Sequence, residues 1–506
     1  MAKKLLSYLL FPRAGNKNYE LAQTKNTPQY SKFSLILEDY ADMAVEFALQ
    51  HGCQYCDVRA ETIETKGFLL ENGEIEYCTS SEDRGLGIRV LAAGAWGFYS
   101  ISNPQSLEEI KNAANDAVKS ALYYSTNKKN KVKLAETKTH VDKVKFNLIK
   151  QPTLEELTKL GFECDSIIRK KKRIIKSSIS IEYDDFLKYF VNSEGTKITQ
   201  TFVDTIANLS ATAHESGLTE SVGSTEGGRG GMEMVTGNND ITNTAEFVAQ
   251  KASELLDAKT AKEDMATVVM NPDFVALLTH EILGHPSEAD RVLGKEMAWA
   301  GGAWWAGKIG QKVGSDKLTV IDDPTIPGNL GWYKYDDEGI FAKSRTLIEN
   351  GVLVNHMQSR ETAAIFNTEP NSGMRATRYE FMPLIRMACT CIKQGGWDPQ
   401  EMVKEVKNGY LISNMKVPSI DMMRYNWSIS CQFAQKIENG EPTELLRDVI
   451  VMGTAPEFFN SIDACGKDFT VRPITNCGKG DPMQIMRMGN GGPHIRGVAT
   501  VKSVES

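Results

Sequence analysis

The spacing of apolar residues predicts an opening helix followed by glycine-punctuated strands. Apolar side chains recur at helical spacing after Ser34, and Gly52 is the residue type that most readily ends such a helix. Asn72-Gly73 is a strong hairpin signal, because both residues tolerate positive φ. Ser106 and Glu109 have the spacing of a capping box, which predicts a second helix. The predicted elements are a helix at 34–52, strands at 57–63, 67–77, 84–90 and 94–98, and a helix at 106–123.

The pattern continues with a further helix, a strand pair and a glycine-rich segment. Residues 128–145 are lysine-rich and predict an exposed connection, and the next predicted elements are a helix at 154–168, paired strands at 176–213 and a helix at 245–256. Residues 223–231 are very rich in glycine but lack the Lys-Ser/Thr that a phosphate-binding loop places after its glycines. We therefore expect a flexible loop there.

Length and element order together predict more than one domain. The chain has 506 residues, which exceeds what one hydrophobic core usually supports. We predict an N-terminal extension at 1–33, an N-terminal α+β domain at 34–240 and a C-terminal domain at 241–506. The predicted fold class is α+β, with a mixed α/β N-terminal half and a C-terminal half rich in antiparallel strands.

Composition and charge exclude several classes of function. The chain is 41% hydrophobic and 24% charged, as folded proteins commonly are, and its net charge is −7. This charge disfavours a broad nucleic-acid surface, so no nucleic-acid partner is expected. The basic run at 169–173 lacks interleaved aromatic residues and is interpreted as a solvated helix end.

Cysteine usage and hydropathy favour a cytoplasmic protein. Nine cysteines are spread along the chain without the spacing of a disulfide scaffold, and Cys53-x-x-Cys56 has no partner pair and is interpreted as packing. The apolar stretch at 5–11 is at the short limit for a signal peptide and no small-residue cleavage site follows, so we interpret it as part of a mature extension. No run approaches the ~18 to 20 apolar residues that span a bilayer, and no membrane association is expected.

One short segment carries the residue types of a zinc hydrolase. Asn271-Pro272 is a good helix start, and His280, Glu281 and His285 follow on the same predicted helix. Imidazoles can hold a metal, and a carboxylate can take a proton from its bound water. Histidines five residues apart lie about 140° apart on an ideal helix.

The sequence suggests how the two histidines could meet. We expect a break in the helix between them, with Gly284 allowing an unusual backbone and Pro286 biasing His285 away from the α region. A lone histidine in a helix is more often a core residue than a ligand, but two histidines beside a glutamate favour a metal. A catalytic zinc usually takes three protein ligands. Spacing alone leaves the third ligand open among Cys465, Cys477, His356, Glu288 and Asp290.

The segment His280–Arg291 resembles the zinc motif of TldD subunits of the TldD/PmbA family. The likeness extends over about residues 35 to 495. The motifs that carry it are DRGLGIRVLAAGAWGF at 83–98, GGRGGME at 227–233, HEILGHPSEADR at 280–291, IDDPTIPGNLGWYKYDDEG at 321–339, RTLIENGVL at 345–353, QSRETA at 358–363, NSGMRA at 371–376, PLIRM at 383–387, IDACGKDF at 462–469 and NCGKGDPMQ at 476–484.

The resemblance implies a ligand set, a reaction and a partner. It implies that Cys477, which opens the later Cys-Gly-Lys segment, is the third zinc ligand with His280 and His285; Cys465 opens a similar segment, but the family's earlier segment is not the metal-binding one. It further implies one Zn²⁺ per active subunit, Glu281 as the general base, and hydrolysis of unfolded or short peptides. A related PmbA-like subunit or a second copy of this chain is the implied partner.

Two other interpretations of the metal motif remain open at this point. A zinc-dependent amidase acting on a small molecule would use the same residues. A non-catalytic subunit with a structural zinc would have four protein ligands, and the presence of Glu281 argues against it. The acidic cluster Asp336-Asp337-Glu338 is expected to be a turn or a substrate-facing loop with no ligand role.

Overall fold

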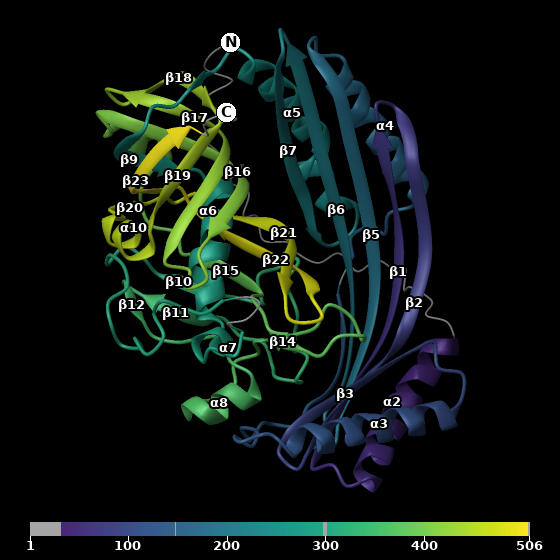
Figure 1. The fold of residues 1–506 in the computed structure, drawn as a ribbon. Coiled ribbons are helices and arrows are strands. Elements are labelled where there is room, and N and C mark those ends of the chain that lie inside the picture. The colour runs from purple at the N-terminus through teal and green to yellow at the C-terminus, as the bar shows by residue number, and fades with distance from the viewer. Residues whose placement is uncertain (1–31, 147, 297–300, 504–506) are drawn as a thin grey trace.

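The computed structural model describes residues 32–146, 148–296 and 301–503, and its N-terminal half is built on one sheet of long strands (Figure 1). The predicted extension at 1–33 therefore lies, up to residue 31, outside the described residues. The strands of this sheet run in the order β3-β2-β1-β5-β6-β4, with β7 also paired to β6. They are β1 (Tyr55–Glu71), β2 (Glu74–Ala92), β3 (Ala95–Ser102), β4 (Val141–Lys145), β5 (Ile174–Asn192), β6 (Lys197–Glu215) and β7 (Leu218–Arg229).

Tight turns of the expected chemistry connect these strands. Asn72 and Gly73 have φ values of 50° and 84°, and they close the β1–β2 hairpin as predicted. Ser216 and Gly217, at 51° and 84°, do the same between β6 and β7. The lysine-rich segment at 128–145 is an open connection up to residue 140 and then adds β4, which pairs in parallel with β6.

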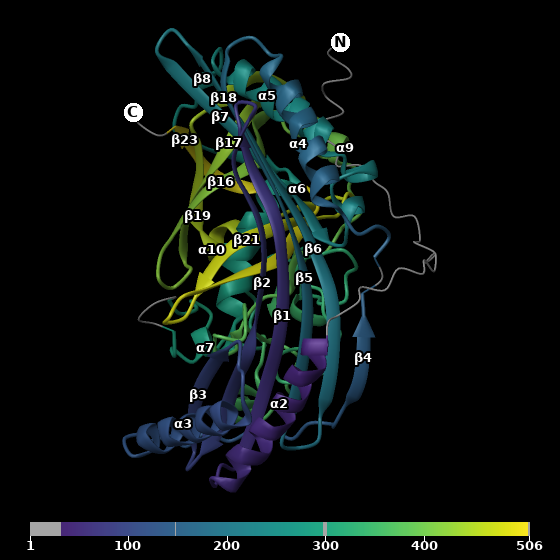
Figure 2. The ribbon, with the colours of Figure 1, turned by 90° about the vertical axis from the view of Figure 1, so that its right-hand side faces the viewer.

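Helices cover the two ends of the long strands and bury two separate cores. Figures 1 and 2 show α2 and α3 at the lower end and α4 and α5 at the upper end. Ser106 accepts from the Glu109 N–H at the start of α3, which confirms the predicted N-cap, while the Glu109 carboxylate accepts from the Gln105 N–H and does not complete the predicted capping box. The helix predicted at 245–256 begins at residue 241, because Asp240 caps it. These helices are α2 (Lys32–Gln50), α3 (Leu107–Ser125), α4 (Leu154–Arg169) and α5 (Ile241–Leu255).

The glycine-rich segment at 223–231 is mostly strand, so the expectation of a flexible loop was wrong. Residues up to Arg229 belong to β7, and their glycines let other backbone segments approach closely. A Cβ at Gly227 would lie 2.2 Å from the Thr205 oxygen, and one at Gly228 would lie 2.1 Å from the Gly328 oxygen. Glycine composition here reflects close packing and not mobility. The boundary near residue 240 stays a prediction; α5, which follows it, packs on β6 and β7.

The C-terminal half is dominated by antiparallel pairings, as predicted, and its larger sheet closes on itself. β16 pairs with both β9 and β17, and the circuit β16-β9-β23-β19-β17 is complete. The parallel exceptions are β16 with β9, β18 with β8, and β15 with β22. The strands of the larger sheet are β8 (Lys259–Thr260), β9 (Asp264–Met270), β16 (Asn408–Ile420), β17 (Asn426–Glu438), β18 (Glu441–Arg447), β19 (Val449–Thr454), β20 (Ala464–Cys465) and β23 (Ile495–Ser503).

A six-stranded sheet in the order β12-β11-β10-β15-β22-β21 lies beside this closed sheet, and helix α6 packs against β16, β21 and β22. No helix of the described ranges is long and apolar enough to cross a membrane. The remaining α-helices and strands are α6 (Pro272–Leu278), α7 (Ala289–Val292), β10 (Val320–Asp322), β11 (Arg345–Glu349), β12 (Val352–Leu353), α8 (Arg360–Phe366), β13 (Met374–Arg375), β14 (Leu384–Ile385), β15 (Cys389–Ile392), α9 (Pro399–Lys404), α10 (Ala455–Ser461), β21 (Thr470–Lys479) and β22 (Gln484–Gly492).

Buried ion pairs join the two halves. Arg89 of β2 bonds Asp57 of β1 at 2.5 Å and Glu338 of the C-terminal half at 3.2 Å. Lys188 of β5 bonds Asp337 at 2.9 Å. The acidic cluster at 336–338 is therefore a buried turn at this junction, in agreement with the predicted turn.

Candidate metal centre

The predicted motif helix begins as expected. The Asn271 side chain accepts from the Phe274 N–H at 2.9 Å, and Pro272 occupies the first helical position of α6. The apolar face predicted for this helix is buried against the C-terminal sheets. The buried helix thereby fixes the position and direction of the chain where the histidine motif begins.

The two histidines meet through a widened helix, so the expected break between them was wrong. Residues Thr279–Gly284 form a π-helical turn, in which the His285 N–H donates to the His280 oxygen five residues earlier. Gly284 and His285 both keep right-handed helical angles, even though Pro286 follows. A five-residue hydrogen-bonded turn returns to the same face after five residues, which is the spacing of this motif.

Gly284 serves this turn through its lack of a side chain. Its φ of −70° suits any residue, so left-handed freedom is not what the position requires. A Cβ there would lie 2.0 Å from Sδ of Met387, which is fully buried. The glycine is therefore required by packing.

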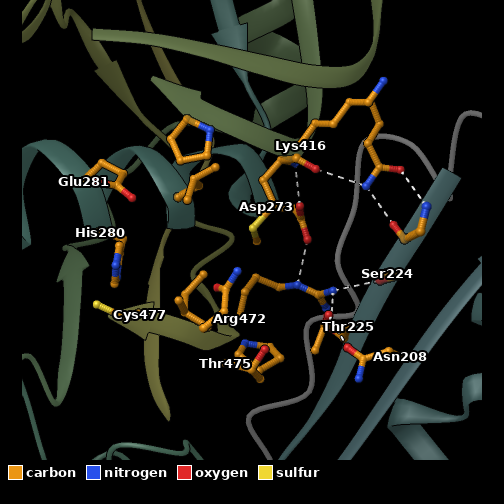
Figure 3. A pocket seen from close by; sticks show the side chains of 18 of the residues that line it. Asn208, Ser224, Thr225, Asp273, His280, Glu281, Lys416, Arg472, Thr475 and Cys477 are labelled. Carbon is orange, nitrogen blue, oxygen red and sulfur yellow. Dashed lines mark hydrogen bonds and ion pairs between the residues drawn. The ribbon is translucent and has the colours of Figure 1, made fainter. Parts of the chain in front are cut away.

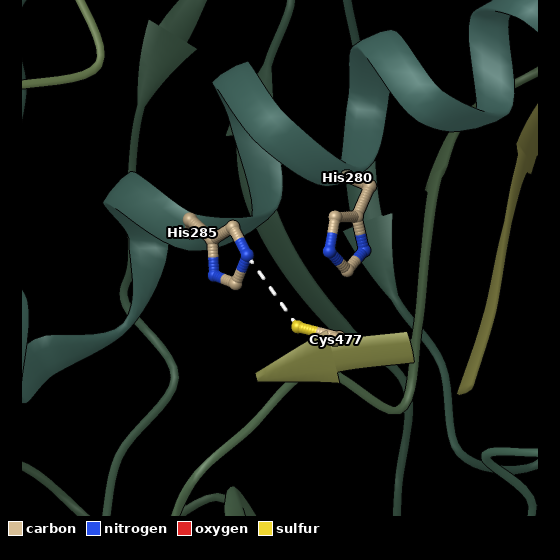
Figure 4. Close-up of side chains that lie close together, drawn as sticks. All are labelled: His280, His285 and Cys477. Carbon is tan, nitrogen blue, oxygen red and sulfur yellow. Dashed lines mark hydrogen bonds between the residues drawn. The ribbon is translucent and has the colours of Figure 1, made fainter. Parts of the chain in front are cut away.

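His280, His285 and Cys477 form a compact, buried group of metal-binding side chains. One ligand atom from each lies within 4.8 Å of the others, and Cys477 Sγ lies 3.5 Å from His285 Nε2. Zn–S and Zn–N bonds of about 2.3 and 2.05 Å in a tetrahedron give a separation of about 3.6 Å. Figure 4 shows both imidazoles, from one helix, directed toward Cys477 on β21. The donor set therefore fits zinc.

Hydrogen bonds to the far side of each ring orient the two histidines. His280 Nδ1 lies 2.9 Å from Asn490 Oδ1, and His285 Nδ1 lies 3.2 Å from Glu288 Oε2. For His280, the Asn490 oxygen favours a proton on Nδ1, which leaves Nε2 for a metal. His285 Nδ1 lies between the Glu288 carboxylate and Arg291 Nη2, a donor at 3.1 Å, and the other ring nitrogen, Nε2, faces Cys477. Glu288 is itself held by Arg291 Nε at 2.5 Å.

The electrostatics of the cluster favour a cysteine thiolate. Burial alone would raise the pKa of Cys477, but the charges of His280, Arg386 and His285 outweigh it and hold the pKa well below its usual value. Burial would lower the pKa of His280, but Cys477 raises it to about 9. The thiolate is the form of cysteine that binds a metal.

The other proposed third ligands lie outside the cluster. Cys465 is on β20, where its Sγ lies 3.6 Å from the Lys317 oxygen. His356 is buried with neither ring nitrogen hydrogen-bonded. Glu288 contacts Nδ1 of His285, the ring nitrogen on the side away from Cys477. The Asp290 carboxylate accepts from Lys479 Nζ at 2.7 Å. Of the five candidates, only Cys477 lies with the two histidines.

A cavity of about 830 Å³ lies beside the cluster and is lined by residues from both halves of the protein. His280, His285, Cys477 and Glu281 all line it, and Figure 3 shows Glu281 and His280 on one wall, with Asn208, Ser224 and Thr225 of the N-terminal sheet opposite. The volume suits a ligand of small-peptide size.

Sequence reasoning gave no role to three residues around the site. Asn490 and Arg424 are ordinary polar residues far along the chain from the motif, and Arg386 lies in the PLIRM segment at 383–387, which contributed to the family resemblance without pointing to the metal site. Arg386 Nη2 donates to the Cys477 oxygen, and Arg424 Nη1 lies 2.5 Å from Glu281 Oε2. Only the folded chain brings them to the histidine motif.

Family models match three consecutive parts of the chain. The PmbA/TldA metallopeptidase domain 1 matches residues 56–121, the central domain matches 147–258 and the C-terminal domain matches 263–500. A metalloprotease of Methanocaldococcus jannaschii is 33% identical over 462 residues, covering 90% of this chain and 98% of the relative. The chain belongs to the TldD/PmbA metallopeptidase family.

Other TldD/PmbA relatives agree with this assignment. The zinc metalloprotease TldD homolog of Saccharolobus solfataricus is 26% identical over 463 residues, covering 89% of this chain and 97% of the relative. The crystal structure of TldE from Thermococcus kodakarensis has the same fold, with a TM-score of 0.74 at 18% identity, and covers 92% of this chain and 100% of that one. The names of the relatives support a metallopeptidase.

Proposed function

We propose that this protein is a zinc-dependent peptidase that hydrolyses unfolded or short peptides. The observation that carries the proposal is the buried His280, His285 and Cys477 cluster, which opens on an 830 Å³ cavity beside Glu281. The family membership and the zinc metalloprotease name of one relative support the metal and the reaction class.

The proposed roles follow from the positions of the side chains. His280, His285 and Cys477 hold the metal, and Asn490 and Glu288 orient the two imidazoles. Bound zinc lowers the pKa of a coordinated water and polarises a carbonyl. Glu281 takes the proton from the attacking water and passes it to the leaving amine nitrogen as the C–N bond breaks.

Strand edges beside the cluster support an extended peptide as the substrate. Seven consecutive residues of β21, 472–478, line the cavity. A strand face would contribute alternate residues only, so a consecutive run indicates that the strand edge faces the cavity. In the described sheets β21 pairs with β22 alone, and hydrogen bonding to such an edge recognises a peptide by its backbone. We infer weak selectivity for side chains.

We further propose that the active unit contains a second subunit, either a PmbA-like relative or another copy of this chain. The similarity in fold to TldE supports a partner of this family. The chain itself carries a full zinc ligand set, so it would be the catalytic member of a mixed pair.

The test compares hydrolysis of an unfolded protein, short peptides and simple amides by the zinc-loaded protein, alone and with a candidate PmbA-like subunit. We expect cleavage of the unfolded protein and the peptides, and its loss in Glu281→Gln with the zinc retained. Cleavage of the simple amides alone would favour a small-molecule amidase. Zinc without any hydrolysis in either preparation would favour the structural role.

A further inference from the structure

Arg424 places a cation directly on the proposed general base. Its Nη1 donates to Glu281 Oε2 at 2.5 Å. The two side chains are only 15% and 14% exposed, and both line the cavity that contains His280 and Cys477. The guanidinium group therefore lies inside the proposed reaction chamber, within one hydrogen bond of a reacting group.

The backbone around Arg424 holds this side chain in place. Arg424 has a φ of 62°, a left-handed conformation that is unfavourable for a residue with a side chain. The Asp421 carboxylate stabilises the turn by accepting the N–H groups of Met423, Tyr425 and Asn426 at 2.9, 3.0 and 2.7 Å. These hydrogen bonds hold the backbone of Arg424 in one conformation.

The turn is also fastened to the segment that follows residue 300. The Gly302 N–H donates to the Met422 oxygen and the Trp304 N–H donates to the Met423 oxygen, both at 2.8 Å. Gly301 allows this approach, because a Cβ there would lie 2.1 Å from the Met422 oxygen. Hydrogen bonds to this neighbouring segment therefore fix the position of the β16–β17 turn that carries Arg424.

The charge on the partner of Arg424 changes during peptide hydrolysis. When the water oxygen attacks the carbonyl carbon, the water proton moves to Glu281, whose carboxylate becomes neutral. The π electron pair of the carbonyl moves onto its oxygen, which becomes negative. Arg424 thus loses its anionic partner on Glu281 at the moment when a new anion forms in the same cavity.

We propose that Arg424 is a catalytic residue that donates a hydrogen bond to this oxyanion, an inference that rests on the proposed peptidase function. No covalent bond to Arg424 forms or breaks. The proton on Glu281 then moves to the leaving nitrogen, the C–N bond breaks and the carbonyl re-forms. A preorganised cation aimed at developing charge stabilises the transition state more than the ground state.

Steady-state kinetics test this role. Arg424→Ala is expected to lower kcat by about 10²- to 10³-fold, as loss of an oxyanion donor does, with KM changed by less than about threefold and zinc content unchanged. Arg424→Lys should recover part of kcat. The matched control is Arg173→Ala: Arg173 also has a positive φ, 76°, and pairs with Asp257 at 2.7 Å away from the cavity. Its kinetic constants should equal those of the wild type.

A binding measurement separates transition-state stabilisation from a structural role. A phosphinic peptide mimics the tetrahedral oxyanion, and its Kd should rise about 100-fold in zinc-loaded Arg424→Ala. The matching amide peptide, bound to the inactive Glu281→Gln protein with and without Arg424→Ala, should change in Kd by less than about threefold.

If the wild-type protein is an active peptidase, three results for Arg424→Ala would overturn the proposed role of Arg424 and leave the proposed function intact. They are an unchanged kcat, a rise in KM without a fall in kcat, or loss of zinc. An equal loss of affinity for the phosphinic and amide peptides would also overturn it. A wild-type protein that cleaves no peptide, alone or with a partner subunit, would instead overturn the proposed function and this inference with it.

Discussion

Substitution of Gly284 by alanine should damage both the fold and the metal site, because the π-helical turn has no room for a methyl group. The added Cβ would lie 2.0 Å from Met387 Sδ, and ordinary contact requires about 3.5 Å or more, so one of the two must move by about 1.5 Å. Met387 is fully buried and its Sδ also accepts from Asn490 Nδ2 at 3.6 Å. Overpacking of this kind lowers the free energy of unfolding by about 1–3 kcal/mol.

The same displacement reaches both proposed histidine ligands. Gly284 directly precedes His285, and Met387 contacts the asparagine that orients His280. We therefore expect zinc affinity to fall at least about tenfold in Gly284→Ala, the lower end of the effect of disturbing groups that support metal ligands. Urea unfolding of the metal-free protein and competition with a chromophoric zinc chelator measure the two effects separately.

A double-mutant cycle with Met387→Ala identifies the cause. Met387→Ala alone should lower the free energy of unfolding by about 2–5 kcal/mol, because it leaves a cavity. The double variant should be about 1–3 kcal/mol more stable than the sum of the single effects, since the new methyl group fills that cavity. Gly396→Ala is the control: Gly396 is exposed, has no atom within 4 Å of an added Cβ, and should change stability by less than about 0.5 kcal/mol. Additive single effects, or a Gly284→Ala protein indistinguishable from wild type, would refute the steric explanation.

Three further predictions follow from other parts of the structure. Asn490→Ala removes the acceptor of the His280 Nδ1 proton and should weaken zinc binding about 10- to 100-fold in a chelator competition; an unchanged affinity would contradict the orienting role. Burial lowers the pKa of His356 to about 4, so its contribution to stability is present above pH 6.5, the ordinary pKa of the group, and is lost as the pH falls toward 4. His356→Leu should therefore reduce the fall in unfolding free energy between pH 7 and pH 4 by about 3 kcal/mol. Parallel curves of unfolding free energy against pH for the variant and the wild type would contradict this. Arg89→Ala leaves Asp57 and Glu338 buried without their cation and should lower the unfolding free energy, measured by urea unfolding, by about 3–5 kcal/mol. Lys119→Ala, which breaks an exposed ion pair, should change it by less than about 0.5 kcal/mol. Equal effects of the two substitutions would count against the buried junction.

Local signals in the sequence predicted the elements whose geometry depends on neighbouring residues. The Asn72-Gly73 turn and the Ser106 cap are confirmed because their hydrogen bonds involve residues two to four positions away. The start of α6 at Asn271-Pro272 is confirmed for the same reason. Family resemblance added Cys477, which spacing alone could not choose over four other candidates.

Contacts between distant segments decided the features that the sequence did not predict. The same residue types form α-helical and π-helical turns, so the local sequence does not distinguish the two. Here the wider turn packs against Met387, which lies 103 positions after Gly284. The glycines of β7 were mistaken for a loop because the backbone segments that approach them come from β6 and from residue 328. Arg424 is 143 positions from Glu281, so no local pattern connects the two.

X-ray absorption at the zinc edge of the metal-loaded protein tests the central claim most directly, because it counts the ligands of the metal by element. The account predicts one sulfur at about 2.3 Å, two imidazole nitrogens at about 2.0–2.1 Å and one exchangeable oxygen from water. A shell without sulfur, or one completed by a fourth protein ligand with no water, would contradict the assignment of His280, His285 and Cys477 to an open catalytic site.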